Sequence, residues 1–313
     1  MLSFLPKWLR GTIAILMITL NTLVLFPFVL LFAILKLIIP LDTWRKFCTI
    51  VLIFICNTLW IGFNNLTLRL LHRIEWDVDG LQGLSPEHWY LVTCNHQSWA
   101  DIPVIQYVMK REIPMLKFFL KQQLIWVPLI GIAWWALDFP FMKRYTKEQI
   151  EKNPSLKGKD LETTRKACEK FKYTPVTVFN FMEGTRFTPE KHRNQQSPYK
   201  HLLKPKAGGA AFVLGAMGEQ LHTLLNITIY YPGGAHGFWG LLSGEIEKVV
   251  VRIEPMEIPQ QFLGKDYQED ARFREEFQQW VGELWERKDR LIDELEQRHK
   301  LASSQLVQDA GVS

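Results

Sequence analysis

The chain has 313 residues, of which 48% are hydrophobic and 22% are charged, so it can bury a core and is neither disordered nor fibrous. A net charge of +5 together with 12 tryptophans suits an anionic membrane surface or an anionic substrate better than DNA. Nucleic acid is not an expected partner, since the sequence has no recognisable nucleic-acid-binding motif. The four scattered cysteines have no paired spacing, which is typical of free thiols in a reducing compartment.

The N-terminal segment predicts a membrane anchor. Residues 11–35 contain no charged side chain, and a helix of this length spans the ~30 Å hydrocarbon core of a bilayer. A signal peptide is the rival interpretation, but its apolar region would be only about 7–15 residues long and would end in a small-residue cleavage site. A second apolar run, 48–63, contains Asn57 and fits a second helix, a re-entrant segment or an interfacial one. We favour a hairpin that returns to the cytoplasmic face.

After residue 73 the sequence alternates between short apolar runs and amphipathic ones. Strands are predicted at 74–78, 89–94, 175–181, 225–231 and 248–253. Helices are predicted at 100–109, 160–171 and 208–217. This alternation predicts an α/β sheet covered by helices on both faces.

The C-terminal part is rich in charged residues. Residues 270–301 predict a surface helix, packed through Phe273, Phe277, Trp280, Leu284 and Leu291. Residues 303–313 predict a frayed tail. A further apolar stretch, 118–135, is aromatic and broken by proline; it fits either membrane contact, with Lys117 and Lys121 at the headgroups, or core packing.

The motif NHQSWAD, residues 95–101, follows the predicted strand 89–94 and carries the strongest chemical signal. His96 can accept a proton near neutral pH, and an ionised Asp101 would fix its tautomer and stabilise its charged form. Five residues along a regular helix turn through about 500°, which would point the two side chains about 140° apart. They can therefore meet only if His96 lies in the loop before a helix and Asp101 lies in its first turns, with Ser98 as the N-cap.

A second polar motif, FMEGTRFT at 181–188, follows another predicted strand. It places Glu183, Gly184, Thr185 and Arg186 at the carboxyl end of that strand, where α/β folds build ligand sites. The planar guanidinium of Arg186 suits a phosphate group. Taken alone, such a turn is more often closed by a salt bridge than used to bind phosphate.

Two basic clusters also suit an anion. FPFMKR, residues 139–144, ends in Lys143 and Arg144, although an adjacent pair of cations is usually a solvated face. KPKAGG, residues 204–209, puts Lys206 before the glycines at the start of a predicted helix, where free amides attract anions. Each cluster is weak by itself.

The order of these motifs resembles that of the glycerolipid acyltransferase family, best known for its lysophosphatidic acid acyltransferases. The family pattern NHxSxxD stands here as Asn95, His96, Ser98 and Asp101, and EGTR is present whole. FMKR follows NHQSWAD by about forty residues, EGTR follows by about forty more, and PKAGG by about twenty. The second motif departs from the family, because residues 136–138 read ALD where a glycine is usual. NITIYYP, residues 226–232, resembles the fourth motif. The sequence of the motifs as a whole looks closest to a bacterial inner-membrane branch of the family.

The resemblance implies a glycerol-phosphate acyltransferase-like α/β fold with an N-terminal membrane-embedded helical segment. The domains would be membrane-anchoring helices at 1–70, an acyltransferase domain at 71–260, and a C-terminal helix and tail at 261–313. The reaction would move a fatty acyl group from acyl-CoA or acyl-carrier protein to the free hydroxyl of a lysophospholipid, most simply 1-acylglycerol-3-phosphate giving phosphatidic acid. The protein would work on the cytoplasmic face of a bacterial inner membrane.

The resemblance also implies roles for the residues. His96 would be the general base and Asp101 its orienting partner, so that the substrate's own alcohol replaces the serine of a triad and no acyl-enzyme forms. Amides near Gly184 or near the helix start at Ser98 would hold the oxyanion. Contacts to the substrate would come from Glu183, Gly184, Thr185, Arg186, Arg144, Lys143 and Lys206. No cofactor or metal is expected beyond the thioester donor.

Two alternatives stay open from the sequence. One is a transacylase that takes its acyl chain from another phospholipid, or an enzyme for a different headgroup. The other is a non-catalytic membrane protein that binds lipid and has kept the scaffold; loss of His96 or Asp101 would mark it, and both residues are present.

Overall fold

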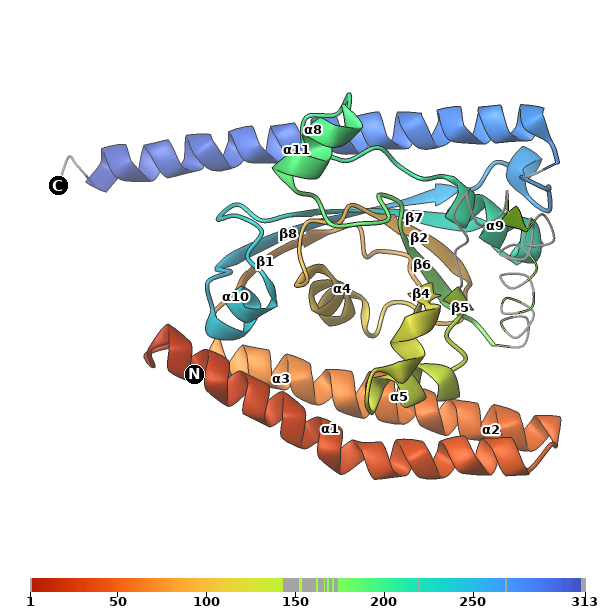
Figure 1. Cartoon of the computed structure of the whole chain (residues 1–313). Coiled ribbons are helices and arrows are strands. Elements are labelled where there is room, and N and C mark those ends of the chain that lie inside the picture. The colour runs from red at the N-terminus through yellow and green to blue at the C-terminus, as the bar shows by residue number, and fades with distance from the viewer. Residues whose placement is uncertain are drawn as a thin grey trace.

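A computed structural model describes residues 2–142, 174–218, 220–267 and 269–310, with a few isolated positions between 143 and 173. The chain is arranged in layers (Figure 1). A mixed sheet lies in the middle, a long C-terminal helix crosses one side of it, and an N-terminal helical hairpin runs along the other side.

The hairpin is made of two long helices. Helix α1 spans Lys7–Ile38, and after a short turn the chain returns as α2 (Asp42–Ile53), a π-helical segment (Phe54–Trp60) and α3 (Ile61–Leu71). The returning elements form one continuous helix of 30 residues, so the run at 48–63 is part of a second helix. Both helices are long and apolar enough to cross a membrane by length and composition.

Six strands form the main sheet. They are β1 (Glu75–Asp79), β2 (Tyr90–Cys94), β3 (Leu116–Phe118), β6 (Thr177–Phe181), β7 (Thr223–Tyr230) and β8 (Lys248–Glu257). Their order is β1-β8-β7-β2-β6-β3, and neighbours are parallel except for the antiparallel pair β7 and β8. Strand β2 is buried along its whole length between β7 and β6, so the loop that follows it begins in the centre of the sheet. A separate two-stranded sheet pairs β4 (Leu120–Lys121) with β5 (Phe141–Met142).

Helices cover both faces of the main sheet. On the hairpin side are α4 (Asp101–Met109) and α10 (Phe238–Ser243), with α5 (Ile130–Ala136) beyond the sheet edge. On the other side are α9 (Gly208–Met217) and α11 (Ala271–Ala310), whose apolar residues share a second core cluster. The short helix α8 (Pro189–Gln195) and the 3₁₀ turns Gln122–Trp126 and Gln260–Phe262 complete the described elements. The predicted α/β class, with helices on both faces, is confirmed.

The predicted strands and the helices at 100–109 and 208–217 are found within a few residues of their expected bounds. The three-residue edge strand β3 was missed, because so short a run has no readable alternation. The predicted helix 160–171 lies largely outside the described residues. The prediction of a frayed tail from residue 303 is wrong up to residue 310, since α11 continues to Ala310.

Two side-chain expectations also need correction. Leu291 is only half-buried, whereas Trp285 and Ile292 of α11 are fully buried. The buried stripe of α11 therefore advances by one position toward its end, as a period of 3.6 residues requires. Lys117 is 3% exposed and donates a hydrogen bond to the carbonyl oxygen of Leu137, so it is not at a headgroup.

Candidate active site

Asn95 fixes the start of the loop that carries His96. This side chain is completely buried at the end of β2. Its Nδ2 donates to the carbonyl oxygen of Ile229 at 2.9 Å, and its Oδ1 accepts from the Ile229 amide, also at 2.9 Å. The Asn95 side chain therefore makes the hydrogen bonds to β7 that a further backbone residue of β2 would make. The backbone is then free to turn away from the sheet.

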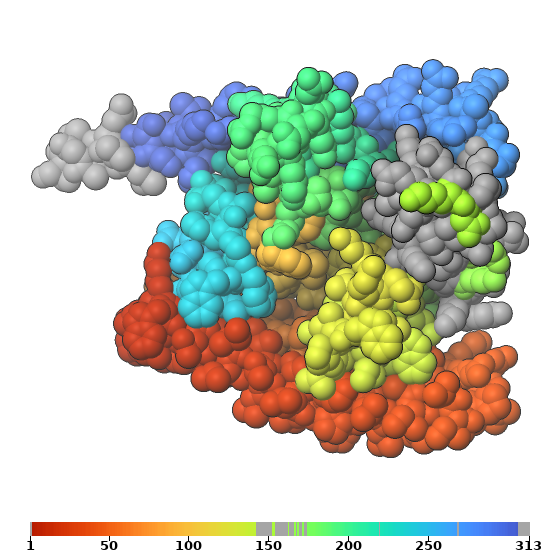
Figure 2. All heavy atoms as spheres, viewed as in Figure 1, coloured from red at the N-terminus to blue at the C-terminus, as the bar shows by residue number. Residues whose placement is uncertain are grey.

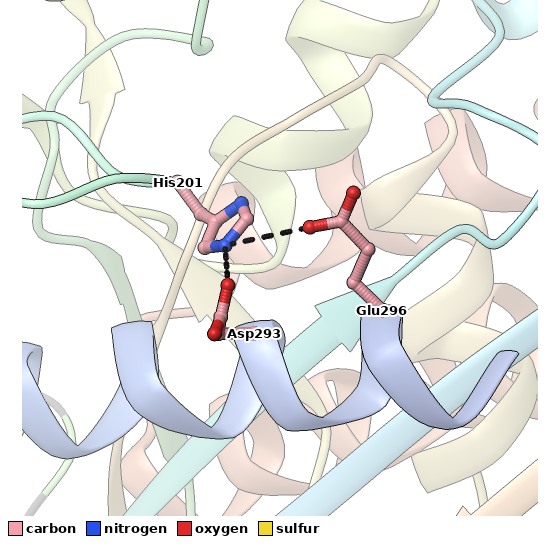
Figure 3. A group of neighbouring side chains, drawn as sticks. All are labelled: His201, Asp293 and Glu296. Carbon is pink, nitrogen blue, oxygen red and sulfur yellow. Dashed lines mark hydrogen bonds and ion pairs between the residues drawn. The ribbon is translucent and has the colours of Figure 1, made fainter. Parts of the chain in front are cut away.

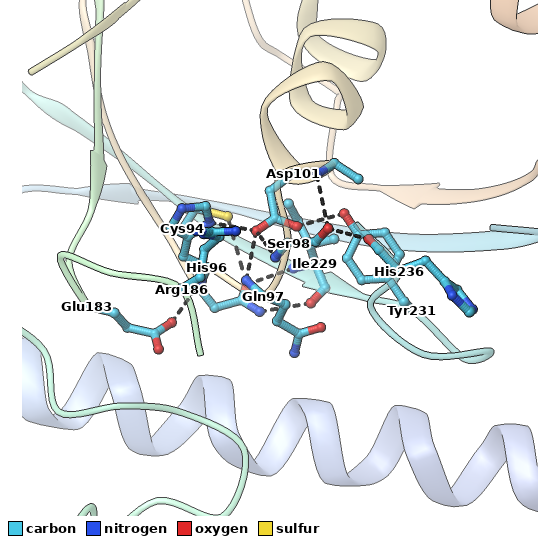
Figure 4. Close-up of polar contacts among 12 residues, drawn as sticks. Cys94, His96, Gln97, Ser98, Asp101, Glu183, Arg186, Ile229, Tyr231 and His236 are labelled. Atoms are coloured by element: carbon cyan, nitrogen blue, oxygen red, sulfur yellow. Dashed lines mark hydrogen bonds and ion pairs between the residues drawn. The ribbon is translucent and has the colours of Figure 1, made fainter. Parts of the chain in front are cut away.

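His96 and Asp101 meet as the spacing required. His96 lies in the loop, Asp101 is the first residue of α4, and His96 Nδ1 is 2.8 Å from Asp101 Oδ2 (Figure 4). Asp101 is fully buried, and the same oxygen accepts the amides of Gln97 at 2.7 Å and Ser98 at 2.9 Å. Its Oδ1 accepts the hydroxyl of Tyr231 at 2.7 Å. Four donors thus hold one buried carboxylate, which gives it a single position from which to orient the imidazole.

Ser98 does not cap the helix as expected. Helix α4 has Ala100 at its N-cap, and no side chain caps it. The Ser98 amide is instead bound by Asp101, while its hydroxyl donates to the carbonyl oxygen of His236 and accepts from the Ala100 amide at 3.0 Å. Ser98 therefore ties the loop that carries His96 to the segment before α10.

The ring nitrogen of His96 that Asp101 does not engage is Nε2. The ring stacks on Phe181 at the end of β6, with centroids 3.9 Å apart and planes 17° apart. Nδ1 is engaged by Asp101, and within the described residues Nε2 has no hydrogen-bond partner. The side chain is 13% exposed. Figure 2 shows the segment around residue 100, in gold, set back between the cyan region of α10 and the yellow region of α5.

Glu183 clamps the two motif loops together. Its Oε1 accepts the amide of His96 at 2.8 Å, and its Oε2 accepts the amide of Leu203 at 3.0 Å. The side chain is fully buried, and this burial raises the pKa of the carboxyl to about 7. Both carboxylate oxygens therefore accept hydrogen bonds from the protein's own backbone. Neither oxygen is left free in this arrangement for the expected contact of Glu183 with substrate.

The rest of the EGTR turn surrounds this clamp. Gly184 has φ +68°, a left-handed conformation that suits glycine, and the side chain of Lys206 lies against it: a Cβ at Gly184 would be 3.3 Å from Lys206 Cδ. After the turn, the amide of Phe187 donates to the carbonyl oxygen of His96 at 2.7 Å. The fold thus brings together Lys206 and the EGTR turn, two segments that the sequence analysis considered separately as candidate anion contacts.

Arg186 is held next to an exposed tryptophan. Its guanidinium lies over the ring of Trp99, 4.1 Å from the centroid, and Trp99 is 56% exposed. Lys191 of α8 donates to Thr185 Oγ1 at 2.8 Å and to the Arg186 carbonyl oxygen at 3.0 Å. Helix α8 thus contributes a cation to this turn. Lys143 and Arg144 lie outside the described residues.

Several of the amides at the two expected sources of an oxyanion hole already have acceptors within the protein. The amides of Gln97 and Ser98 donate to Asp101, and the Gly184 amide donates to the carbonyl oxygen of Phe181 at 2.9 Å. In the part of the chain that the structure describes, the amides of Thr185 and Arg186 have no acceptor. These two are the donors that the turn leaves available.

Sequence reasoning missed two residues that support the site. Tyr231 binds Asp101, and its position at the end of β7 beside β2 is a signal that strand-end reasoning could have used. Lys288 of α11 is 1% exposed, and its Nζ donates to the carbonyl oxygen of Ile227 and lies 3.3 Å from Thr228 Oγ1. Burial lowers the pKa of Lys288 to about 8. A lysine in a charged helix offers no signal of this kind.

Lys288 and Glu183 belong to one electrostatic group beneath the site. The positive charge of Lys288 acts to lower the pKa of Glu183, and Glu183 acts to raise that of Lys288. Cys94, at the end of β2, is completely buried and is influenced by the charges of both, and its burial raises the pKa of the thiol well above its usual value. Such a thiol is inert as a nucleophile.

One further cluster combines metal-ligand side chains among the described residues. His201 Nε2 lies 3.3 Å from Asp293 and 3.8 Å from Glu296 (Figure 3). Lys200 already forms ion pairs with both carboxylates, and the amides of Lys200 and His201 donate to Asp289 at 2.8 and 2.7 Å. This network fastens the segment leading to Leu203 onto α11, and it lies apart from His96.

Comparison with known proteins gives the same picture. The family model described as Acyltransferase matches residues 75–230. The 1-acyl-sn-glycerol-3-phosphate acyltransferase gamma of Mus musculus is 26% identical over 272 residues, covering 75% of this chain and 69% of that protein. The 2-acyl-1-lysophosphatidylinositol acyltransferase of Saccharomyces cerevisiae is 22% identical over 244 residues, with 64% and 59% covered.

Another relative and a solved structure can be set beside these. The human 1-acyl-sn-glycerol-3-phosphate acyltransferase gamma is 26% identical over 189 residues; the alignment covers 56% of this chain and 44% of that protein, less than half of its length. The crystal structure of the 1-acyl-sn-glycerophosphate acyltransferase PlsC from Thermotoga maritima aligns with a TM-score of 0.48 and 18% identity, covering 89% of this chain and 97% of that one. With the family model matching the segment that holds the NHQSWAD and EGTR motifs, the chain belongs to the glycerolipid acyltransferase family and is an O-acyltransferase.

Proposed function

We propose that this protein transfers a fatty acyl group from a thioester, acyl-CoA or acyl-carrier protein, to the free hydroxyl of a lysophospholipid, with 1-acylglycerol-3-phosphate as the acceptor and phosphatidic acid as the product. The observation that carries the proposal is the 2.8 Å contact between His96 Nδ1 and the buried Asp101, which leaves Nε2 as the base. The relatives named for 1-acylglycerol-3-phosphate and for lysophosphatidylinositol support a lysophospholipid acceptor.

The reaction needs no enzyme nucleophile. His96 Nε2 takes the proton of the acceptor hydroxyl as its oxygen attacks the thioester carbonyl, a step worth about 10²–10⁴-fold in rate. The tetrahedral intermediate carries an oxyanion, for which the amides of Thr185 and Arg186 are the donors that remain. Collapse breaks the carbon–sulfur bond, and the departing thiolate takes the proton from His96. Neither Ser98, whose hydroxyl donates to the His236 carbonyl oxygen, nor the buried Cys94 is placed to form an acyl-enzyme.

The cations of the EGTR turn support an acceptor with a phosphate group. Arg186 is presented by its stacking on Trp99, while Lys191 and Lys206 lie at the same turn. A guanidinium and two ammonium groups near one another match the charge of a phosphate dianion. We assign the phosphate of the lysophospholipid to this group.

The hairpin supports a place on the membrane. Gly11 near the start of α1 packs on Trp239 of α10, and Lys36 near its end binds Asp138 at 2.5 Å. These contacts are about 37 Å apart along the helix, yet both are made with the same domain. We therefore place the hairpin along one leaflet, with its exposed apolar residues in the lipid and both ends on the side of the domain.

This placement gives each part of the chain a role. Residues 1–70 would anchor the protein and residues 71–260 would catalyse, with the C-terminal helix packed beneath the sheet. The donor is made and used in the cytoplasm, so the domain would lie on the cytoplasmic face of the inner membrane of a bacterium. Exposed aromatic side chains on α5 and α10, which include Trp135, Phe238 and Trp239, would lie at the interface.

The test is an acyl-transfer assay on membranes that contain the protein. A panel of lysophospholipids is offered with labelled acyl-CoA, and diacyl product and free thiol are both measured. We expect product with lysophosphatidate, background activity for His96→Ala, and a loss of about 10³–10⁴-fold for Asp101→Asn at unchanged folding. His88→Ala, which removes an exposed histidine, is the matched control.

Three outcomes would count against the proposal. If the His96→Ala variant retained activity, His96 would not be the general base. Diacyl product that forms without acyl-CoA and without free thiol would instead identify a transacylase. A preparation no more active than the His96→Ala variant would identify a lipid-binding protein without catalysis.

A further inference from the structure

A second group of cations lies away from the candidate active site. It forms where the end of α3 passes the end of α4 and the strand β1. Two adjoining cavities of about 390 and 440 Å³ lie here, and both are lined by Arg69 and Tyr107. Arg73 lines one of them, and Lys110 and Arg111 line the other. Lys110 and Arg111 follow the C-terminal end of α4, about 13 Å along the helix axis from Asp101 at its start. We call this pair of cavities the Arg69 groove.

The positive charge of the groove is not neutralised by ion pairs with the described residues. None of its four cations forms an ion pair with a carboxylate in the described ranges, and Glu112 is the acidic residue in the lining. Among the acids of β1, Glu75 is paired with Lys248 and Asp77 with Arg252. The third acid, Asp79, ends the strand and forms no ion pair with these four cations among the described residues. Burial, with the charges of Arg111 and Arg69, lowers the pKa of Lys110. Like charges held together in this way favour an anionic ligand.

Two of the cations are built into the fold. Lys110 Nζ donates to the Thr58 carbonyl oxygen, in the π-helical segment, at 3.0 Å. It lies against Gly62, where a Cβ would be only 2.4 Å from Nζ, so the absence of a side chain makes room for the ammonium. A π-helical segment of this kind is frequent at functional sites.

The aromatic wall fixes the second of these cations. Arg69 Nε donates to the Tyr107 hydroxyl at 2.8 Å, and its guanidinium lies 5.2 Å from the centroid of that ring. Tyr107 in turn stacks on Trp76, with centroids 4.0 Å apart and planes 7° apart. Arg73 and Arg111 are exposed and make no hydrogen bond through their side chains among the described residues, so their donors are available to a ligand.

The groove adjoins the apolar surface of the hairpin. Leu66 and Leu70 of α3 are 50% and 44% exposed, and they flank Arg69 along the chain. Cations next to apolar side chains on one helix are typical of a surface at the level of lipid headgroups. A ligand in the groove would thus have its charged part among the cations and an apolar part beside these leucines.

We propose that the Arg69 groove binds the phosphate headgroup of an anionic membrane phospholipid, a lipid distinct from the acyl acceptor at His96. The proposal rests on the membrane placement given above. Its ligand is a phosphodiester lipid with a net negative charge, which would bridge α3 of the hairpin and α4 of the domain. The lipid would thereby hold the domain against the leaflet in which the hairpin lies.

The experiment titrates dioctanoyl phosphatidylglycerol into the detergent-solubilised full chain and follows binding by calorimetry. Titration with dioctanoyl phosphatidylcholine and with glycerol 3-phosphate provides the comparison. The groove variant is Arg73→Gln with Arg111→Gln, both exposed side chains. We expect it to weaken phosphatidylglycerol binding about 30-fold, on the basis of about fivefold for each cation near an anionic lipid. Acyl transfer in neutral mixed micelles should be unchanged.

The charge-matched control removes Arg290 and Arg298, two exposed cations of α11 on the opposite side of the sheet, and should bind as the wild type does. Equal phosphatidylglycerol binding by the groove variant would overturn the proposal, as would equal binding of phosphatidylcholine. Glycerol 3-phosphate binding as tightly as the lipid would assign the groove to a soluble phosphate ester. A wild type that binds the lipid but transfers no acyl group would refute the proposed enzyme and leave the groove standing.

Discussion

The hairpin and α11 are both long helical coverings of the same sheet, but they present opposite surfaces. The hairpin exposes large apolar side chains along its length, and Leu16, Leu20, Leu23 and Leu37 are each more than half exposed. Helix α11 turns its apolar stripe inward, and along its described side chains Leu301 is the exposed large hydrophobic residue. Its outer face instead carries ion pairs one turn apart, such as Arg272–Glu276 and Lys300–Glu296.

The difference shows that helix length says little about a helix's surroundings. Two coverings of 30 or more residues fit against one domain, and the side chains on their outer faces decide which solvent each meets. Helix α11 also reaches further inward. Trp285 Nε1 donates to the Leu203 carbonyl oxygen at 3.1 Å, and Leu203 in turn donates to Glu183. We infer that the hairpin places the enzyme on the membrane while α11 supports its site.

The largest effect is expected when the apolar outer face of the hairpin is made polar, like that of α11. Replacing Leu20, Leu23 and Leu31 together by glutamine removes exposed apolar side chains, each worth about 1.5–3 kcal/mol when buried. We expect the partition into membranes to fall by about 10³-fold or more, as measured by fractionation. Acyl transfer in detergent should persist. Leu301→Gln on α11 is the control, and an unchanged partition of the triple variant would contradict the membrane role of this face.

A smaller effect is expected at Glu183, where support from α11 reaches the catalytic loop. In Glu183→Gln the amide nitrogen cannot accept, so one of the backbone amides of His96 and Leu203 loses its partner. Such an orphaned donor costs about 1–3 kcal/mol, and we expect turnover to fall by about 10²-fold. Glu190→Gln, on the exposed surface of α8, should be neutral.

Stability measured against pH sharpens the same prediction. The folded pKa of Glu183, about 7, lies above its ordinary value of 4.5, so the folded state favours the protonated form. This contribution is complete below about pH 4.5 and is lost as the pH rises through 7, an effect of up to about 3 kcal/mol. The thermal midpoint of the wild type should therefore fall relative to that of Glu183→Gln between pH 5 and pH 8. A difference that stays constant with pH would show that this carboxyl does not titrate there.

The smallest effect concerns Lys288 and tests whether α11 acts on the site by charge. Lys288→Met retains a long apolar stem, and replacing a buried charge in this way often leaves stability unchanged. Without the ammonium, Glu183 ionises less readily, so we expect about tenfold lower activity at pH 7. Activity should recover as the pH rises, which displaces the acidic side of the pH–rate profile upward. A loss that is equal at every pH would mean packing alone, and Arg290→Met serves as the exposed control.

The sequence predicted the parts of the site that depend on local spacing. His96 and Asp101 lie five residues apart, and only a loop followed by a helix lets them meet, so their geometry was predictable. The buried strands β2 and β6 were readable as apolar runs of five or more residues. Lys206 and Gly184 were each expected to contact the substrate, and they lie side by side.

The remaining contacts depend on residues that are distant in the chain. Tyr231 binds Asp101 across 130 residues of sequence, and no local pattern reports that distance. Ser98 looked like an N-cap, but the Asp101 carboxylate binds its amide and a carbonyl oxygen near α10 takes its hydroxyl. Lys117 lies in an aromatic stretch that suits a membrane surface, yet its ammonium is turned inward to the Leu137 carbonyl oxygen. In each case a tertiary partner outweighs a local preference.

The pairing of β1 with β8 has a consequence for how the chain is made. Glu75 of β1 lies opposite Lys248 of β8, 173 residues later, so the edge of the sheet stays unpaired while most of the domain is translated. Contacts of such long sequence separation form slowly. The hairpin, which precedes β1, is complete long before, and its apolar helices emerge with no folded partner to cover them. On the proposed membrane placement, the order of synthesis would deliver the hairpin to the lipid first, and the domain would then fold at the membrane surface.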